Sequence, residues 1–459
     1  MTADVKDSLD SKKNKLTLSR DTSGAAKLKR LNEILRDPTA KLESIKLHNY
    51  TMTKEMSSAV ANAVKKISLG LKELDLSNTT LQDSEAQVIS EGLGNPYAKL
   101  DILRLTNCGI TFQGIMHLAI ALKSNSTNLK ELDLHNDDLS DHGIKILCLC
   151  LEDPSNSLER LNLENCRVNE GGCATLARAL QSNPGHLKEL CLSYNHIGQT
   201  GIQSLADLLK SSVIETLQLS HCRITQDGCA ALASGLRYKP SPLKQLDLSS
   251  NTLEDSGVKA LLAFLQDKDC KLHTLKLANC SVSQNGFGYL GRALRSNPTH
   301  IRKLDLSNNA SGEDAIRTLF EAIQDTHCKL EELKLCWCKL GENSCPYLSL
   351  VLSSNSSLRT LDLSHNKLQS TGVQHLAKGL ASPVCHVESL RLSQCHITEE
   401  GFIALATALH TNPSHLKELD ISKNKPGASG IQQLTDIQRN PQSLLRKLDT
   451  SPYTRHTST

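Results

Sequence analysis

One apolar phrase recurs along almost the whole chain and constrains its fold more than any other feature. The phrase is Leu-x-x-Leu-x-Leu-x-x-(Asn/Cys)-x-Leu, and its copies begin at positions 42, 71, 100, 129, 158, 187, 214, 243, 272, 301, 330, 358, 387, 416 and 445. Twelve of the fourteen steps between copies are 29 residues long, and the other two are 27 and 28. A fixed period of this size indicates units that stack on one another, so we expect one solenoid rather than several globular domains.

Within each repeat, a strand pattern is followed by a helix pattern. Leu161 and Leu163 alternate with polar residues, which predicts a strand with one buried face. From Cys173 onward, apolar residues recur at spacings of three and four and so share one stripe of a helix. Strands joined through helices lie parallel with right-handed connections, and helices need about 8–10 Å where strands need about 4.8 Å. We therefore predict an α/β right-handed horseshoe, with a parallel β-sheet on the concave face and α-helices on the convex face.

The Asn/Cys position of the phrase, called the ladder position below, lies where the chain leaves the strand. Backbone groups buried there need partners, and an asparagine amide can bridge adjacent turns with both of its ends. Cysteine supplies a smaller and weaker donor. Early copies depart from the pattern with Tyr50, Thr79 and Asp137. The predicted structural ladder consists of Cys108, Cys166, Asn195, Cys222, Asn251, Cys280, Asn309, Cys338, Asn366, Cys395 and Asn424.

The sixteen cysteines follow the register of the repeat, as packing would require. Six occupy the ladder position, and Cys173, Cys229 and Cys345 begin the helix stripe. Buried free thiols of this kind need a reducing compartment, which indicates the cytoplasm. The triplet from Cys336 to Cys338 could suggest a metal site, but its alternate residues are expected to point to opposite faces. We therefore predict no metal site.

The ends of the chain lack the repeat phrase. We predict a disordered tail at residues 1–24, an N-terminal cap helix within 25–41, a repeat domain of about 14 repeats at 42–448 and a C-terminal tail at 449–459. Leu28, Leu31 and Leu35 would share one face of the cap helix, which would cover the open first strand. No stretch approaches the roughly 20 apolar residues of a membrane-spanning helix.

Repeats with asparagine and with cysteine alternate in the ladder position from Cys166 to Asn424. LKELCLSYNHI (187–197) followed by IETLQLSHCRI (214–224) resembles the ribonuclease-inhibitor-type subclass of leucine-rich-repeat proteins, over about residues 42–448. Phrases such as SNPGHLKELCLSYNHIGQTGIQSL look still more like the carboxy-terminal repeats of vertebrate NOD-like receptors, particularly the fish-type groups. Those receptors also carry an ATP-driven NACHT module, and this chain has no Gly-x-x-x-x-Gly-Lys-(Ser/Thr) segment, so we expect no nucleotide site.

The outward strand position between the second and third leucines, called the central row, alternates acid and base at its two ends. Neighbours in this row are expected about 4.8 Å apart, so that opposite charges can pair across strands. The row is either a self-neutralising ladder or a charged ligand surface. Its charges are interrupted at Asn162, Cys191 and Gln218.

Two aromatic residues are expected on the same concave surface. Tyr194 and Trp337, the only tryptophan, would face outward from their strands. Exposed aromatic residues often anchor protein interfaces, and the alternative is that they pack on their neighbours. The candidate protein-binding residues are Tyr194, His221, Trp337, His365 and Gln394.

The composition and motifs indicate a binding protein. A net charge of +3, with 22% charged and 3% aromatic residues, favours neither a nucleic acid nor a membrane as partner. We find no candidate catalytic residue and expect no cofactor, so the partner should be another protein. The resemblance implies a cytoplasmic ligand-sensing or autoinhibitory region of a NOD-like receptor in innate immune signalling. Two alternatives stay open, a ribonuclease inhibitor, which would need an acidic face, and a Ran-type GTPase-activating protein, whose family has a long acidic tail.

Overall fold

The computed structural model describes residues 8–10, 15–18, 24–37, 39–66, 69–124, 129–238, 241–412 and 415–452. The chain divides into two compact units. Unit 1 comprises Met1–Arg223 and Ser234–Pro242, and unit 2 comprises Ile224–Ala233 and Leu243–Thr459. Each unit is described by itself.

Unit 1 stacks a layer of strands against a layer of helices. Strands β2 to β9 run parallel in chain order, and each pairs with the next one repeat later, as Leu74 pairs with Leu103. Its strands are β1 (Ser8–Asp10), β2 (Lys15–Leu18), β3 (Ser44–Leu47), β4 (Glu73–Asp75), β5 (Ile102–Arg104), β6 (Glu131–Asp133), β7 (Arg160–Asn162), β8 (Glu189–Cys191) and β9 (Thr216–Gln218). Its helices are α1 (Gly24–Arg36), α2 (Lys54–Lys65), α3 (Asp83–Leu93), α4 (Phe112–Ser124), α5 (Ser140–Leu151), α6 (Glu170–Ser182) and α7 (Gly198–Leu209).

Unit 2 repeats the same two layers. Strands β10 to β17 are parallel and in register, as Leu275 pairs with Leu304. The strands are β10 (Gln245–Asp247), β11 (Thr274–Lys276), β12 (Lys303–Asp305), β13 (Glu332–Lys334), β14 (Thr360–Asp362), β15 (Ser389–Arg391), β16 (Glu418–Asp420) and β17 (Lys447–Asp449). The helices are α9 (Glu254–Leu265), α10 (Gln284–Ser296), α11 (Glu313–Gln324), the short η2 (Glu342–Ser344), α12 (Cys345–Ser354), α13 (Gln369–Leu380), α14 (Glu399–Thr411) and α15 (Gly427–Arg439). Helix α8 (Gln226–Leu236) has residues in both units.

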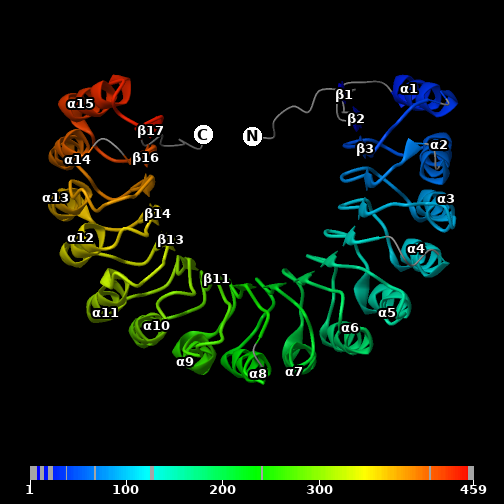
Figure 1. Cartoon of the computed structure of the whole chain (residues 1–459), viewed down its shortest axis with the longest axis horizontal. Coiled ribbons are helices and arrows are strands. Elements are labelled where there is room, and N and C mark those ends of the chain that lie inside the picture. Colours follow the sequence, from blue (N-terminus) through cyan, green and yellow to red (C-terminus); the bar gives the residue numbers. More distant parts are fainter. Residues whose placement is uncertain are drawn as a thin grey trace, which may run out of the picture. The chain divides into compact units, whose positions relative to one another are not determined.

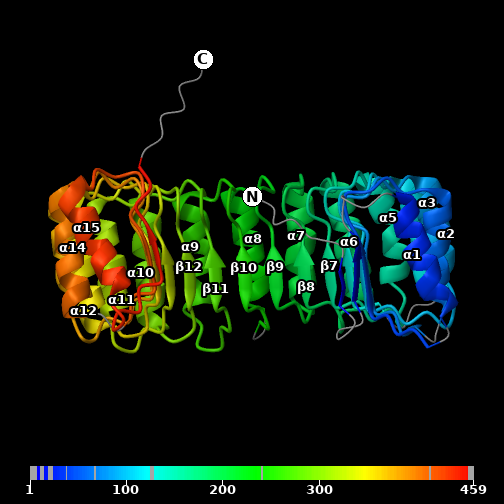
Figure 2. The ribbon, with the colours of Figure 1, turned by 90° about the horizontal axis from the view of Figure 1, so that it is seen from above.

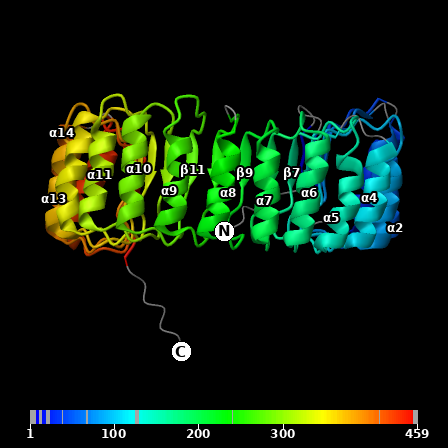
Figure 3. The same ribbon diagram turned by 90° about the horizontal axis from the view of Figure 1, so that it is seen from below.

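In each unit the strands form the inner layer and the helices the outer layer (Figure 1). Strands β7, β8 and β9 run side by side in unit 1 (Figure 2), and helices α9, α10 and α11 do so in unit 2 (Figure 3). The predicted α/β solenoid with parallel strands and outer helices is therefore confirmed. Within the described residues, every helix is too short or too polar to cross a bilayer.

The leucines of the phrase and the helix stripe form the core between the layers. Leu161 and Leu163 are 2% and 0% exposed, and Cys173, which begins the stripe of α6, is fully buried. Neighbouring helices approach closely, because a Cβ added to Gly92 of α3 would lie 2.9 Å from the Cα of Ala61 in α2. All sixteen cysteines are free thiols, and all but the half-buried Cys336 are buried.

The amino-terminal end differs from the sequence prediction of a disordered tail over residues 1–24. Residues 8–10 and 15–18 form the antiparallel strands β1 and β2, and β2 pairs in parallel with β3, with Leu16 fully buried. The first repeat strand is thus covered by β2, which supplies hydrogen-bond partners to its backbone edge. Helix α1 packs beside α2 with Leu31 buried. Residues 1–7, 11–14 and 19–23, and residues 453–459 of the predicted C-terminal tail, lie outside the described residues.

Candidate functional site

The five candidate binding residues share one position of the repeat, in the turn that follows each strand. The sequence predicts that they face outward from the strands themselves. Each of these strands is only three residues long, however, and Tyr194 and Trp337 each come three residues after their strands, β8 and β13, have ended. The position directly before the ladder position, called the turn row below, therefore belongs to the exit turn.

Residues of the turn row have left-handed backbone conformations. The φ angles are 59° at Tyr194, 54° at His221, 59° at Trp337, 60° at His365 and 55° at Gln394. Asparagine tolerates this region better than other residues with a Cβ, and bulky side chains enter it only at an energetic cost. The turn row is asparagine in seven repeats, at Asn49, Asn78, Asn107, Asn136, Asn165, Asn279 and Asn308.

The solenoid enforces this conformation through its backbone. The N–H of Tyr194 donates to the carbonyl of Ser220 at 2.8 Å, and that of Trp337 donates to Ser364 at 3.1 Å. Both bonds reach the following repeat, so the turn cannot relax without breaking the contact between repeats. The positive φ is shared by every residue of the turn row, from Asn49 to Lys423, so it belongs to the repeat, and Tyr194 and Trp337 adopt it at an energetic cost.

The asparagines of the turn row hold one another by side-chain hydrogen bonds. In unit 1, Asn107 Nδ2 donates to Asn78 Oδ1 at 2.9 Å, and Asn165 Nδ2 donates to Asn136 Oδ1 at 2.8 Å. At the next repeat, aromatic rings replace asparagine in the turn row. Tyr194 and His221 stack with ring centroids 4.2 Å apart and planes inclined by 15°, while Tyr194 remains 50% exposed.

Unit 2 makes the same change. Trp337 and His365 stack at 4.3 Å with planes inclined by 11°, and Trp337 is 53% exposed. Burial, followed by the charge of Lys423, lowers the pKa of His365, so this imidazole is neutral at physiological pH. Gln394 follows one repeat later in the same turn and is half-buried. The two rings are thus nearly parallel, and about half of the Trp337 side chain remains open to a partner.

The central row behaves differently from the sequence expectation of charges paired across strands. Among the described residues, ion pairs within the row join only Lys276 to Asp247, at 3.2 Å, and Lys46 to Asp75, at 4.0 Å. Instead, every aspartate of the row accepts a hydrogen bond from the backbone N–H two residues later, which stabilises the exit turn. These aspartates are Asp75, Asp133, Asp247, Asp305, Asp362, Asp420 and Asp449.

Two bases of the central row, Arg104 and Lys334, pair with glutamates at the first position of the strands. Arg104 donates to Glu73 Oε1 and to Glu131 Oε1, both at 2.6 Å, and so ties three neighbouring strands together. Lys334 likewise pairs with Glu332 of its own strand at 2.8 Å. These charges are held within the sheet rather than presented freely.

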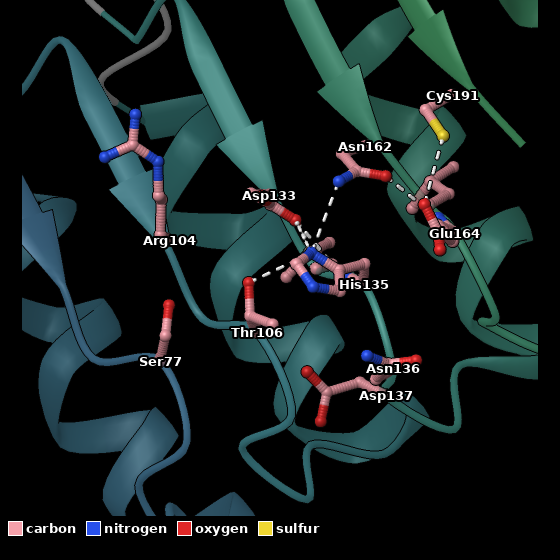
Figure 4. Close-up of polar contacts among 12 residues, drawn as sticks. Ser77, Arg104, Thr106, Asp133, His135, Asn136, Asp137, Asn162, Glu164 and Cys191 are labelled. Carbon is pink, nitrogen blue, oxygen red and sulfur yellow. Dashed lines mark hydrogen bonds and ion pairs between the residues drawn. The ribbon is translucent and has the colours of Figure 1, made fainter. Parts of the chain in front are cut away.

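A polar cluster surrounds His135 in the turn after β6 (Figure 4). Its Nδ1 lies 2.7 Å from Asp133 Oδ1, 3.2 Å from Thr106 Oγ1 and 3.3 Å from Asn162 Nδ2. The hydrogen bond to Asp133 raises the pKa of His135. Cys191, which the sequence places outward, is instead 7% exposed, with its Sγ 3.7 Å from Glu164 Oε2.

The ladder position lies beneath the turn row in both units. Asn195 spans two repeats, and the Sγ of Cys166 donates to the carbonyl of Leu134 at 3.1 Å. Burial raises the pKa of the Cys108 thiol to about 12. These residues hold the turns in place. No group of three or more His, Cys, Asp or Glu side chains suited to a metal occurs in the part of the chain that the structure describes.

The sequence prediction selected five residues of the turn row but assigned them to the strands, although a signal for the turn was present. Asparagine recurs directly before the ladder position in seven repeats, and recurrent asparagine at one position of a turn indicates positive φ. The stacking of His221 and His365 on their neighbours had no comparable signal, because it depends on the spacing of repeats in space.

Comparisons with known proteins identify relatives of the repeat. The family model described as a leucine-rich repeat matches residues 185–206, 210–233, 239–262, 354–377 and 385–406. The ribonuclease inhibitor of Mus musculus is 36% identical over 433 residues, which cover 94% of this chain and 69% of that protein. The human NACHT, LRR and PYD domains-containing protein 3 is 38% identical over 133 residues, which cover 29% of this chain and 13% of that protein. An internalin of Listeria monocytogenes aligns with a TM-score of 0.46 and 15% identity, covering 79% of this chain and 89% of that chain.

Proposed function

We propose that this chain, which belongs to the ribonuclease-inhibitor-type family of leucine-rich-repeat proteins, recognises a protein partner in the cytoplasm. It would act there as the ligand-sensing or autoinhibitory region of a NOD-like receptor. A leucine-rich-repeat chain of this family is a protein-binding module. The stretch shared with the human NACHT, LRR and PYD domains-containing protein 3 supports the NOD-like proposal, and the role in innate immune signalling is what the resemblance of the repeats implies.

The observation that carries this proposal is the stack of Trp337 on His365. Tryptophan and tyrosine are enriched among the residues that dominate binding energy, because a large rigid ring loses little conformational entropy on contact. A tryptophan that served packing alone would be covered on both faces, whereas Trp337 is half exposed. The stack with neutral His365 fixes the ring before a partner arrives, which reduces the entropy lost on binding.

A site-specific crosslinking experiment tests the proposal. A photoreactive amino acid placed at Gln394, within the turn row and outside the stacked pair, should capture a defined protein in cytosol, and the Trp337→Ala change should abolish that capture. Leu350, 50% exposed on helix α12 of the same unit, is the matched control position. Equal capture of the same protein from both positions would refute a binding site on the turn row.

A ribonuclease partner is the second candidate, favoured by the charges on the strands. In unit 1, the first and last residues of strands β3 to β9 include five carboxylates and three cations, where Lys46 is taken as the last residue of β3. In unit 2, the same positions of β10 to β17 include seven carboxylates and five cations. The strand layer of each unit is therefore net acidic, although the whole chain carries +3. An acidic surface suits a basic enzyme.

Inhibition of pancreatic ribonuclease A separates the two candidates. We expect no stoichiometric inhibition, because most acids of the strands are already engaged in exit turns or pairs such as Arg104 with Glu73. Tight inhibition that weakens steeply with added salt would establish the ribonuclease-inhibitor function instead.

A further inference from the structure

Asparagine in the ladder position uses both ends of its amide. Asn195 Oδ1 accepts hydrogen bonds from the N–H groups of Cys166 and Val168, at 3.1 and 3.0 Å. Its Nδ2 donates to the carbonyl groups of Leu163 and Leu192, at 2.8 and 2.9 Å. The position thus requires an acceptor on one atom and a donor on the other. The equivalent bonds are made by Asn309, Asn366 and Asn424.

Asp137 occupies this position in unit 1, with an oxygen where the amide nitrogen would be. Its Oδ1 accepts from the N–H groups of Cys108 and Ile110, both at 3.0 Å, as the asparagine oxygen does. Its Oδ2 is buried and has no hydrogen-bond partner among the described residues, and the residue is 2% exposed. The equivalent atom of Asn195 donates to two backbone carbonyl oxygens, so an ionised carboxylate at Asp137 would set acceptor against acceptor.

We propose that Asp137 keeps a proton on Oδ2 in the folded protein and donates it to a backbone carbonyl, so that unit 1 contains a pH-sensitive latch between two repeats. A neutral carboxylic acid offers one donor and one acceptor and so reproduces the pattern of the amide. When the proton is lost, the carboxylate loses its donor and the two turns it joins become easier to separate. This inference is independent of the proposed function.

The groups around Asp137 are compatible with this assignment. Burial raises the pKa of Asp137 to about 7, although hydrogen bonds from the backbone of Ile110 and Cys108 and the charge of His135 oppose the shift. The thiols of Cys108 and Cys166 lie close by and stay neutral, because burial raises the pKa of both. Figure 4 shows Asp137 in the turn after β6, two residues beyond His135.

The sign of the effect follows from the raised pKa. The folded state binds the proton more tightly than the unfolded state, in which the pKa is near 3.8. The stabilisation by the proton is fully present below that value and is lost as the pH rises through about 7. Between about pH 5 and pH 8 the opening equilibrium of this region should change by up to roughly 100-fold.

Hydrogen exchange of the full chain, corrected for intrinsic exchange, measures this opening by segment. Residues 106–111 include the amides that donate to Asp137, and they should lose protection as the pH rises from about 5 to 8. The change in their protection should approach roughly 100-fold. Residues 164–169, whose amides bond Asn195, are the internal control and should show no such trend. Asp137→Asn should remove most of the pH dependence of residues 106–111 and leave them more protected at pH 8.

Two further variants test the cause. Asn195→Asp should transfer the pH dependence to residues 164–169, which keeps the proposal testable even if Asp137→Asn does not fold. His135→Gln should leave the dependence of residues 106–111 in place. Infrared spectroscopy of the folded wild type at pH 5 should show a protonated carboxyl band that disappears in Asp137→Asn. The proposal is overturned if the band is unchanged in that variant, if His135→Gln removes the pH dependence, or if residues 106–111 show no pH dependence in the wild type.

Discussion

The indole of Trp337 lies on the imidazole of His365, with ring centroids 4.3 Å apart and planes inclined by 11°. The same relationship joins Tyr194 to His221 in unit 1, at 4.2 Å and 15°. In both cases the two rings occupy a turn that most other repeats fill with asparagine. The two stacks therefore replace hydrogen-bonded asparagines of the turn row by aromatic rings, while the left-handed backbone conformation of the turn is kept.

Truncation of this stack separates binding from folding. Trp337→Ala should weaken partner binding by about 2 kcal/mol or more, because a half-exposed ring is an anchor rather than core. The melting temperature should change little. Calorimetric titration and thermal unfolding measure the two effects, and Leu350→Ala should affect neither. A melting temperature lower by several degrees with intact affinity would make Trp337 a packing residue.

Substitution in the ladder position should favour polar side chains. The Sγ of Cys222 donates to the carbonyl of Leu192 at 3.1 Å, and the residue is fully buried. Cys222→Leu should destabilise the protein by about 1–3 kcal/mol, because leucine cannot donate and adds volume to a filled site. Cys222→Asn should be better tolerated. Urea unfolding of the two variants side by side checks the order, and equal or greater stability of the leucine variant would contradict the ladder argument.

Titration of His135 should report its contact with Asp133. The hydrogen bond that His135 donates to Asp133 raises the pKa of His135 above 6.5. The stabilisation by this pair is therefore fully present below 6.5 and is lost as the pH rises through the folded value. NMR should show the imidazole titrating above 6.5, and Asp133→Asn should lower its pKa. An unchanged pKa of His135 in the variant would show that Asp133 does not stabilise the protonated imidazole.

The thiols should react slowly while the protein is folded. Burial raises the pKa of the half-buried Cys336 to about 12, and the other cysteines are more deeply buried. A colorimetric thiol reagent should therefore label Cys336 first and the remainder only after unfolding in urea. Rapid labelling of several thiols in the folded protein at neutral pH would contradict the buried register.

The leucine phrase was sufficient to predict the parallel strands, the helical outer layer and the ladder. Leu161, Leu163 and the stripe from Cys173 are buried because a period of 29 residues returns each side chain to the same environment. The two shortened repeats also keep their strand pairing, β8 with β9 and β13 with β14, since the missing residues fall in loops. Periodicity in the sequence therefore fixes which residues face the core.

The sequence did not determine which polar side chains become partners across repeats. Arg104 pairs with Glu73 and Glu131 of the neighbouring strands, and the aspartates beside it in the central row bond backbone N–H groups. Strand β2 covers β3 at the amino-terminal end, where composition had predicted disorder. These outcomes depend on distances and directions between separate repeats. A one-dimensional pattern specifies the face of each residue, and only the folded chain decides which donor lies within about 3 Å of which acceptor.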